Sequence, residues 1–229
     1  MAKNKKTENE EIIIGSNPVE KYQKPLTIAG IALIAAAVVF VMFRNFYLEP
    51  QQVEASSELF TAEGYFAKDS FELALRGNVE FMGFEEIASD YGMTDAGNLA
   101  NYYAGFCCLH LANSDSTQKD QYFEDAIDYL NKFSSGSKVL DPMAIGGTAD
   151  AYSELGDYEK AASLYMKAAN ASSNEYTAPM FLMKAGLVYE ELGSYQKAAS
   201  AYKKIKADYS TTEKGRNIEK YISRAESKL

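Results

Sequence analysis

Three reactive side chains, Cys107, Cys108 and His110, lie within four residues of one another. The chain has no other cysteine or histidine. Adjacent cysteines bridge only through a strained ring, and metal-binding cysteines are normally two or more residues apart. We therefore expect these thiols to be buried in the core on one side of a helix, with redox sensing as the alternative. No metal ion, no cofactor and no catalytic residue is expected in this segment.

Two other patterns could suggest a catalytic or phosphate site. Glu85–Glu86 and Glu190–Glu191 are acidic pairs, but consecutive residues point about 100° apart on a helix and do not converge on one substrate. Gly146–Gly147 lacks the strand, the lysine and the hydroxyl residue of a phosphate-binding loop, so it is expected to allow close helix packing instead. The sequence predicts a protein that is not an enzyme.

The charge of the chain argues against nucleic acid as a partner. Its 229 residues hold 23 Lys and Arg against 32 Asp and Glu, a formal net charge of −9. Residues 49–229 carry 17 cationic and 28 anionic side chains. Because nucleic-acid binding depends largely on cationic side chains that neutralise phosphates, no nucleic-acid partner is expected.

One uncharged segment, PLTIAGIALIAAAVVFVMF, fills residues 25–43 between Lys24 and Arg44. As a helix it would be about 28 Å long, close to the hydrocarbon thickness of a bilayer. Pro25 suits a first helical turn, and aromatic residues follow the segment where an interface would lie. The sequence predicts a transmembrane helix over 25–47, which makes the lipid bilayer a partner of the chain.

The flanking charges predict the orientation of this helix. Five lysines precede the apolar segment and a single arginine follows it closely. Since cationic loops stay on the cytoplasmic side, residues 1–24 are expected to form a cytoplasmic tail. In a bacterium, this places the helix in the inner membrane and residues 48–229 in the periplasm.

A cleaved signal peptide is the alternative to a permanent anchor. Signal peptides usually have a shorter apolar core and a small-x-small cleavage site, whereas FRNFYLEP follows the segment here. A lipoprotein would need a cysteine directly after the apolar segment, and none is present. These observations favour an uncleaved anchor.

The rest of the chain shows internal repetition. An aromatic residue stands three positions before an alanine four times, and these alanines are 52, 35 and 37 residues apart. Residues 151–169 align with 188–206, each as a helix, a glycine turn and a second helix. One face of each pair carries the residues expected to pack the repeats together: Tyr152, Tyr158, Ala161, Tyr165, Tyr189, Tyr195, Ala198 and Tyr202.

These spacings resemble the tetratricopeptide repeat, a helix-turn-helix family of 34-residue units. The resemblance implies an all-α fold, an α-solenoid of about four hairpins. It is clearest in two units, where the family's signature residues run from Ala149 to Ala168 and from Gly186 to Ile205. Residues 98–133 and 51–77 resemble earlier and less regular units, and residues 213–229 are expected to form a polar terminal helix that caps the solenoid.

In this family the first helix of each hairpin lines a concave face. Five residues on the predicted first helices are candidates for a partner-binding groove: Met143, Asp150, Met180, Met183 and Leu187. Methionines would make such a groove adaptable, although packing between repeats explains them equally well. The Lys and Asn clamp that binds acidic chaperone tails is absent, since its positions hold residues such as Gly146 and Asp150.

The whole layout is similar to the YfgM family of bacterial inner-membrane proteins. That resemblance implies a non-enzymatic adaptor that associates with the SecYEG translocon and with periplasmic chaperones or nascent secreted chains. The alternative is a scaffold subunit of an envelope assembly for outer-membrane biogenesis, secretion or cell division.

The orientation can be tested with a reporter enzyme fused to the carboxy terminus. A reporter that is active only outside the cytoplasm should be active in this fusion, because the lysines hold the amino terminus inside. A well-expressed but silent fusion would contradict the orientation.

Overall fold

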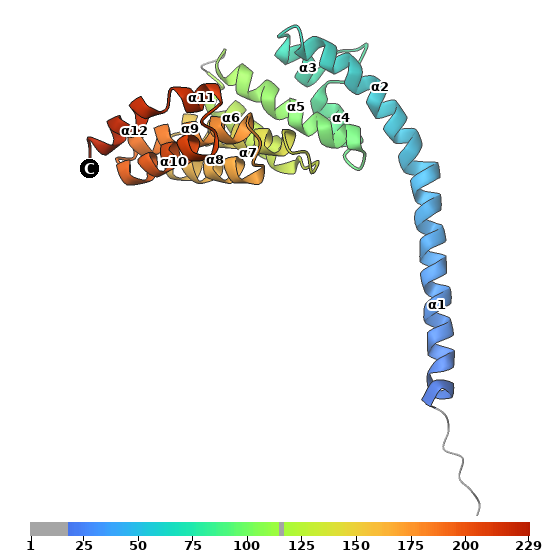
Figure 1. Ribbon diagram of the computed structural model, residues 1–229. Coiled ribbons are helices and arrows are strands. Elements are labelled where there is room, and N and C mark those ends of the chain that lie inside the picture. The colour runs from blue at the N-terminus through green and yellow to red at the C-terminus, as the bar shows by residue number, and fades with distance from the viewer. Residues whose placement is uncertain (1–17, 115–116) are drawn as a thin grey trace, which may run out of the picture. The chain divides into compact units, whose positions relative to one another are not determined.

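The computed structural model describes residues 18–114 and 117–229 (Figure 1), with side chains from residue 25 onward. Most of the predicted cytoplasmic tail, residues 1–17, lies outside the described residues. The chain divides into two compact units, Met1–Glu49 and Pro50–Leu229. Each unit is described by itself below.

The first unit contains the apolar segment. Helix α1 (Pro18–Phe43) is followed by a short π-helical segment, η1 (Arg44–Leu48). The helix begins at Pro18, so Pro25 lies inside it and not in its first turn as expected from the sequence. Among the described residues one helix, Pro25–Phe66, is long and apolar enough to cross a membrane. Its most apolar window of 18 residues has a mean hydropathy of 2.7, and none of that window is buried.

The second unit begins with three helices that pack around a fourth. They are α2 (Glu49–Phe66), α3 (Phe71–Arg76) and α4 (Phe84–Asp90), which precede α5 (Asp95–Ala112). Gln52 Oε1 of α2 accepts hydrogen bonds from the backbone N–H groups of Asp95 and Ala96, at 2.7 and 3.3 Å. This side chain therefore caps the amino end of α5, where backbone donors lack partners within the helix.

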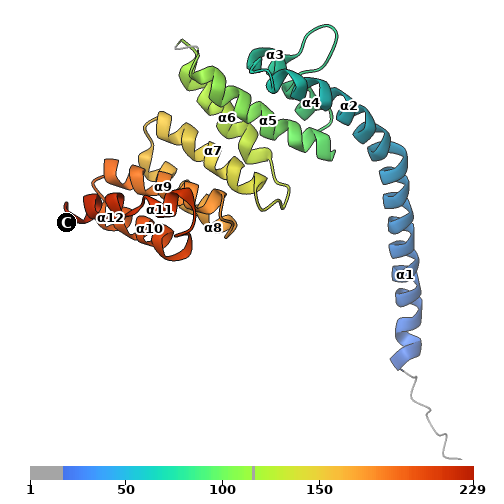
Figure 2. The same cartoon turned by 45° about the horizontal axis from the view of Figure 1, so that its top comes forward.

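Three antiparallel hairpins follow and stack on one another (Figures 1 and 2). They are α5 with α6 (Lys119–Lys132), α7 (Leu140–Glu154) with α8 (Tyr158–Ala171), and α9 (Thr177–Glu191) with α10 (Tyr195–Asp208). The described residues contain no β-strand beyond one isolated bridge, Gly77 with Met82. The prediction of an all-α solenoid is confirmed.

The turns within the last two hairpins depend on glycine. Gly156 and Gly193 have φ values of +83° and +65°, a region that other residues rarely adopt. After Gly156, the side chain of Asp157 accepts a hydrogen bond from Lys160 N–H and so caps α8. These are the turn positions that the sequence alignment predicts.

Small residues bring the helices of each hairpin close together. Ala161 and Ala198 are fully buried, and a Cβ added to Gly186 would lie 2.2 Å from the Tyr202 ring. A Cβ on Gly146 would likewise lie 1.9 Å from the ring of Phe181. Close packing at Gly146 is thus confirmed. This contact lies between neighbouring hairpins, because Gly146 belongs to α7 and Phe181 to α9.

The other residues predicted to pack the repeats differ in burial. Tyr165 and Tyr202 are buried, Tyr152 and Tyr189 are partly buried against the core, and Tyr195 is half-buried. Tyr158 departs from the expectation, because it keeps 40% of its surface exposed. It is the first residue of α8, where the solenoid offers less cover.

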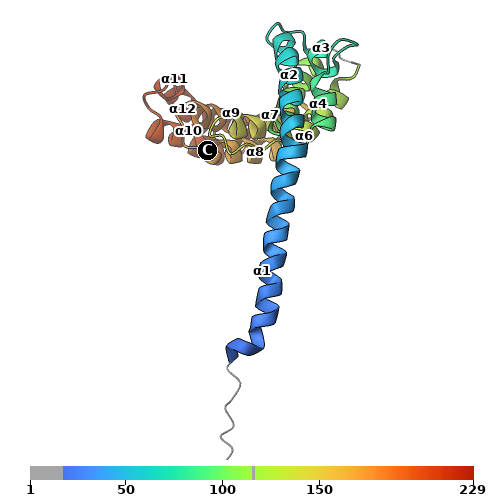
Figure 3. The ribbon, with the colours of Figure 1, turned by 90° about the vertical axis from the view of Figure 1, so that its right-hand side faces the viewer.

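The carboxy terminus forms two helices where one was expected. α11 (Glu213–Arg216) and α12 (Glu219–Glu226) are separated by Asn217 and Ile218. The break lets Ile218 become 1% exposed and directs α12 along α10 (Figure 3). Burial of this isoleucine offsets the loss of helical continuity.

The close approach at Gly186 predicts a large effect of one methyl group. Gly186→Ala should lower the free energy of unfolding by about 1–3 kcal/mol, because the buried Tyr202 ring has no room to move aside. The measurement is thermal unfolding followed by circular dichroism. The control is Gly64→Ala in α2, where a new Cβ meets nothing within 4 Å and should stabilise the helix slightly. Equal effects of the two substitutions would contradict this packing.

Candidate functional site

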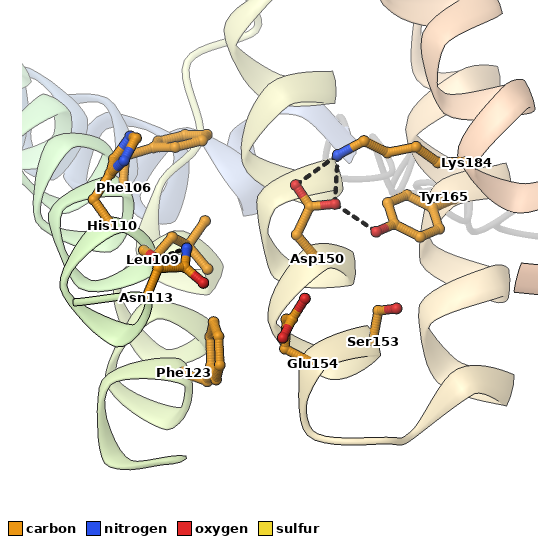
Figure 4. Close-up of a pocket in the computed structure, with 10 residues that line it drawn as sticks. All are labelled: Phe106, Leu109, His110, Asn113, Phe123, Asp150, Ser153, Glu154, Tyr165 and Lys184. Atoms are coloured by element: carbon orange, nitrogen blue, oxygen red, sulfur yellow. Dashed lines mark hydrogen bonds and ion pairs between the residues drawn. The ribbon is translucent and has the colours of Figure 1, made fainter. Parts of the chain in front are cut away.

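A cleft of about 380 Å³ lies along the first helices of three consecutive hairpins (Figure 4). One wall is α5, the floor is α7 with a contribution from α8, and the other wall is α9. The lining residues are Phe106, Leu109, His110, Asn113, Phe123, Asp150, Ser153, Glu154, Tyr165 and Lys184. The cleft thus exists only because the hairpins stack.

A polar network crosses the floor of the cleft from α7 to α9 (Figure 4). Lys184 Nζ lies 2.6 and 2.8 Å from the two carboxylate oxygens of Asp150. The Tyr165 hydroxyl donates a hydrogen bond to the same carboxylate. Burial, and next the negative charge of Asp150, raise the pKa of Tyr165, so this phenol stays protonated and keeps donating.

The next hairpin lacks this network. Leu187 takes the place in α9 that Asp150 takes in α7, one repeat of 37 residues earlier. Tyr202, the counterpart of Tyr165, is fully buried, and its hydroxyl has no hydrogen-bond partner in the described part of the chain. The polar network is therefore specific to the α7–α8 hairpin and is not repeated in the α9–α10 hairpin.

Aromatic side chains form the opposite wall. The His110 ring stacks on Phe71 of α3, with ring centroids 4.1 Å apart and planes 3° apart. Phe106 lies next to Tyr102, at 4.7 Å between centroids. Of these rings, Phe106 and His110 give α5 an aromatic surface toward the cleft, opposite the charges of α7 and α9.

The structure places the five predicted groove residues in different environments. Asp150 lines the cleft. Met143 and Met180 are half-buried against the carboxy-terminal core, Met183 is buried with 9% exposure, and Leu187 is 40% exposed. None of the three methionines lines the cleft, so packing explains their present positions.

Several residues that line the cleft were not predicted as groove residues from the sequence, above all Phe106, Tyr165 and Lys184. A signal for Phe106 exists. Gly105 packs against Leu130 as Gly186 packs against Tyr202, which aligns α5 with the later first helices. In that alignment, Phe106 and His110 take the positions of Asp150 and Glu154.

The two cysteines lie on the other side of α5, inside the core. Cys107 and Cys108 are 0% and 1% exposed and form no disulfide. Burial raises the pKa of both thiols, that of Cys108 to about 12. Within residues 18–114 and 117–229, no three His, Cys, Asp or Glu side chains are grouped so that they could hold a metal ion.

One member of each acidic pair forms an ion pair, Glu85 at the surface and Glu190 with only 15% of its side chain exposed. Glu85 lies 3.4 Å from Arg76, and Glu190 lies 2.7 Å from Arg224 of α12. Each of these two carboxylates therefore has an ionic partner.

Comparisons with known proteins agree with this architecture. Residues 181–212, which contain most of α9 and all of α10, match the family model of the tetratricopeptide repeat. The fold is similar to the crystal structure of a putative kinesin light chain from Podosopora anserina with nearly identical TPR-like repeats, and to that of a variant of the same protein. Each similarity has a TM-score of 0.54 at 13% identity, and covers 76% of this chain and 86% of the other. No curated protein matches the sequence. The second unit is therefore a tetratricopeptide-like solenoid.

The burial of the cysteines predicts that neither thiol reacts in the folded protein. Because both pKa values are raised, the reactive thiolate is scarce at about pH 8, and access is blocked as well. Ellman's reagent should detect almost no thiol in the native chain and both after denaturation. Rapid reaction of the native protein would contradict the packing of α5.

Proposed function

We propose that this protein is a non-enzymatic, membrane-anchored adaptor that binds segments of other proteins in the cleft formed by α5, α7 and α9. The observation that carries the proposal is the cleft itself, since three consecutive first helices contribute side chains to it. Its lining combines aromatic surface with a few fixed polar groups, which is typical of binding sites. The tetratricopeptide-like fold is one used for protein–protein interaction.

The apolar segment supports the membrane part of the proposal. We assign residues 25–47 to a single transmembrane helix, residues 1–24 to a cytoplasmic tail and residues 48–229 to a periplasmic domain of a bacterial inner-membrane protein. The exposed apolar side chains of α1, such as Leu33 at 73% and Val39 at 66%, suit contact with lipid. Tethering would raise the effective concentration of the solenoid for clients that arrive at the membrane.

The similarity to the YfgM family supports a more specific partner. In this proposal the adaptor associates with the SecYEG translocon and presents its cleft to emerging secreted chains or to periplasmic chaperones, in support of protein transport. The alternative role as a scaffold subunit of an envelope assembly predicts tight binding of one folded partner. An adaptor for emerging chains predicts weak binding of many.

Site-specific photocrosslinking in cells tests this proposal. A photoreactive amino acid replaces Ser153 in the cleft, or, as a control, Lys167 on the exposed side of α8. Position 153 should yield adducts with translocon subunits and several secreted precursors, and position 167 should not. A single adduct with one folded envelope protein would support the scaffold instead. The absence of any adduct specific to position 153 would contradict both roles.

A further inference from the structure

Charge is divided unevenly along the solenoid. Residues 50–183 hold 7 Lys and Arg against 21 Asp and Glu, whereas residues 184–229 hold 10 against 6. The α5 and α7 sides of the cleft therefore belong to a strongly acidic part of the chain. Lys184, on the α9 side, is the first cationic residue of the basic part.

Within the cleft, two carboxylates face one cation. Asp150 and Glu154 are four residues apart on α7, so both point toward the same side of that helix. Lys184 is the cleft's own ammonium group, and it is bound to Asp150 through both oxygens. Glu154 has an outside partner, Lys119 of α6, at 3.1 Å, but about half of each side chain in this pair is exposed. Solvent therefore weakens the pair considerably.

The Asp150–Lys184 pair is also open to exchange. The side chains of Lys184 and Asp150 are 39% and 34% exposed, so an ammonium group from outside can reach the carboxylate. The exchange replaces one ammonium–carboxylate contact by another of the same kind. The aromatic wall adds to this, because ring faces such as that of Phe106 attract cations. The protein's own lysines already use this contact at two rings of the cleft: Lys184 lies over Tyr165 at 5.6 Å, and Lys119 lies over Phe123 at 5.5 Å.

From this charge complementarity we propose that the cleft binds a cationic polypeptide segment. A lysine or arginine of that segment pairs with Asp150 and Glu154, and apolar residues beside it contact the aromatic wall. Lys184 is then an internal competitor, which occupies Asp150 in the free protein and weakens binding. This inference rests on the proposed function of the cleft and adds the chemical class of its partner.

Three labelled peptides of about twelve residues test the inference on the purified full-length chain in uncharged detergent. They share the same apolar residues and differ only in carrying Lys, Gln or Glu at the remaining positions. Fluorescence anisotropy should show that the Lys peptide binds about tenfold more tightly than the Gln peptide. This difference should shrink as the salt concentration rises from about 0.05 to 0.5 M, because the interaction is ionic.

Two sets of variants locate the interaction, each with a control that changes the charge equally. Asp150→Asn with Glu154→Gln should abolish most of the preference for Lys, whereas Glu124→Gln with Asp128→Asn, on exposed residues of α6, should keep it. Lys184→Met should tighten binding of the Lys peptide about threefold, since the competitor is lost. Lys167→Met should not tighten it. Misfolding would expose apolar surface and raise the binding of all three peptides alike. A gain confined to the Lys peptide in Lys184→Met therefore remains decisive if the first set is unstable.

The outcomes separate the inference from the function on which it depends. A photoreactive residue at position 153 reports whether each peptide enters the cleft. Capture of all three peptides with equal affinity would overturn the cationic preference and leave the adaptor function standing. Capture of none would overturn both. Self-association of the chain at low salt that blocks the Lys peptide would assign the cleft to the basic region of a second copy, and would also overturn this proposal.

Discussion

A helical hairpin of this size cannot bury its own apolar face, and the whole second unit follows from that constraint. Ala161 and Ala198 are fully buried because a neighbouring helix must lie directly against them. The ring of Phe181 fills the space that Gly146 leaves in the preceding hairpin. Each hairpin thus completes the core of the next one, which makes the fold a chain of nearest-neighbour contacts.

The cleft is a product of the same stacking. Asp150 and Lys184 are 34 residues apart and come together only when α7 and α9 lie side by side. Tyr165 reaches the same carboxylate from α8, so one acidic group links three helices. The site is therefore built on rigid elements, and its geometry depends on the register between repeats.

The repeat architecture could be predicted from the sequence because its signals are local. The glycine turns at 156 and 193, the buried alanines and the alternation of helices all depend on residues close together in the sequence. The residues that line the cleft were harder to predict, because they depend on which side chains of neighbouring repeats come into contact. Of three residues that line the cleft, Asp150 was predicted as a groove residue, whereas Lys184 and Phe106 were not. The methionines satisfy the spacing of a groove, but they pack against the core in the stacked structure. A single terminal helix was predicted, but the chain forms α11 and α12 because the break between them allows Ile218 to be buried. This is a tertiary effect that no local pattern encodes.

The buried hydroxyl of Tyr202 shows that equivalent residues of two repeats can have different hydrogen bonding. This hydroxyl is enclosed beside the Glu190–Arg224 ion pair without a well-formed hydrogen bond, and the ring that carries it fills the space opposite Gly186. The α9–α10 hairpin keeps the tyrosine of the α7–α8 hairpin, but it has Leu187 where Asp150 accepts a hydrogen bond from Tyr165. Repeated units can therefore share a buried tyrosine whose hydroxyl is well hydrogen-bonded in only one of them. Such a position is where a substitution could raise the stability of the solenoid.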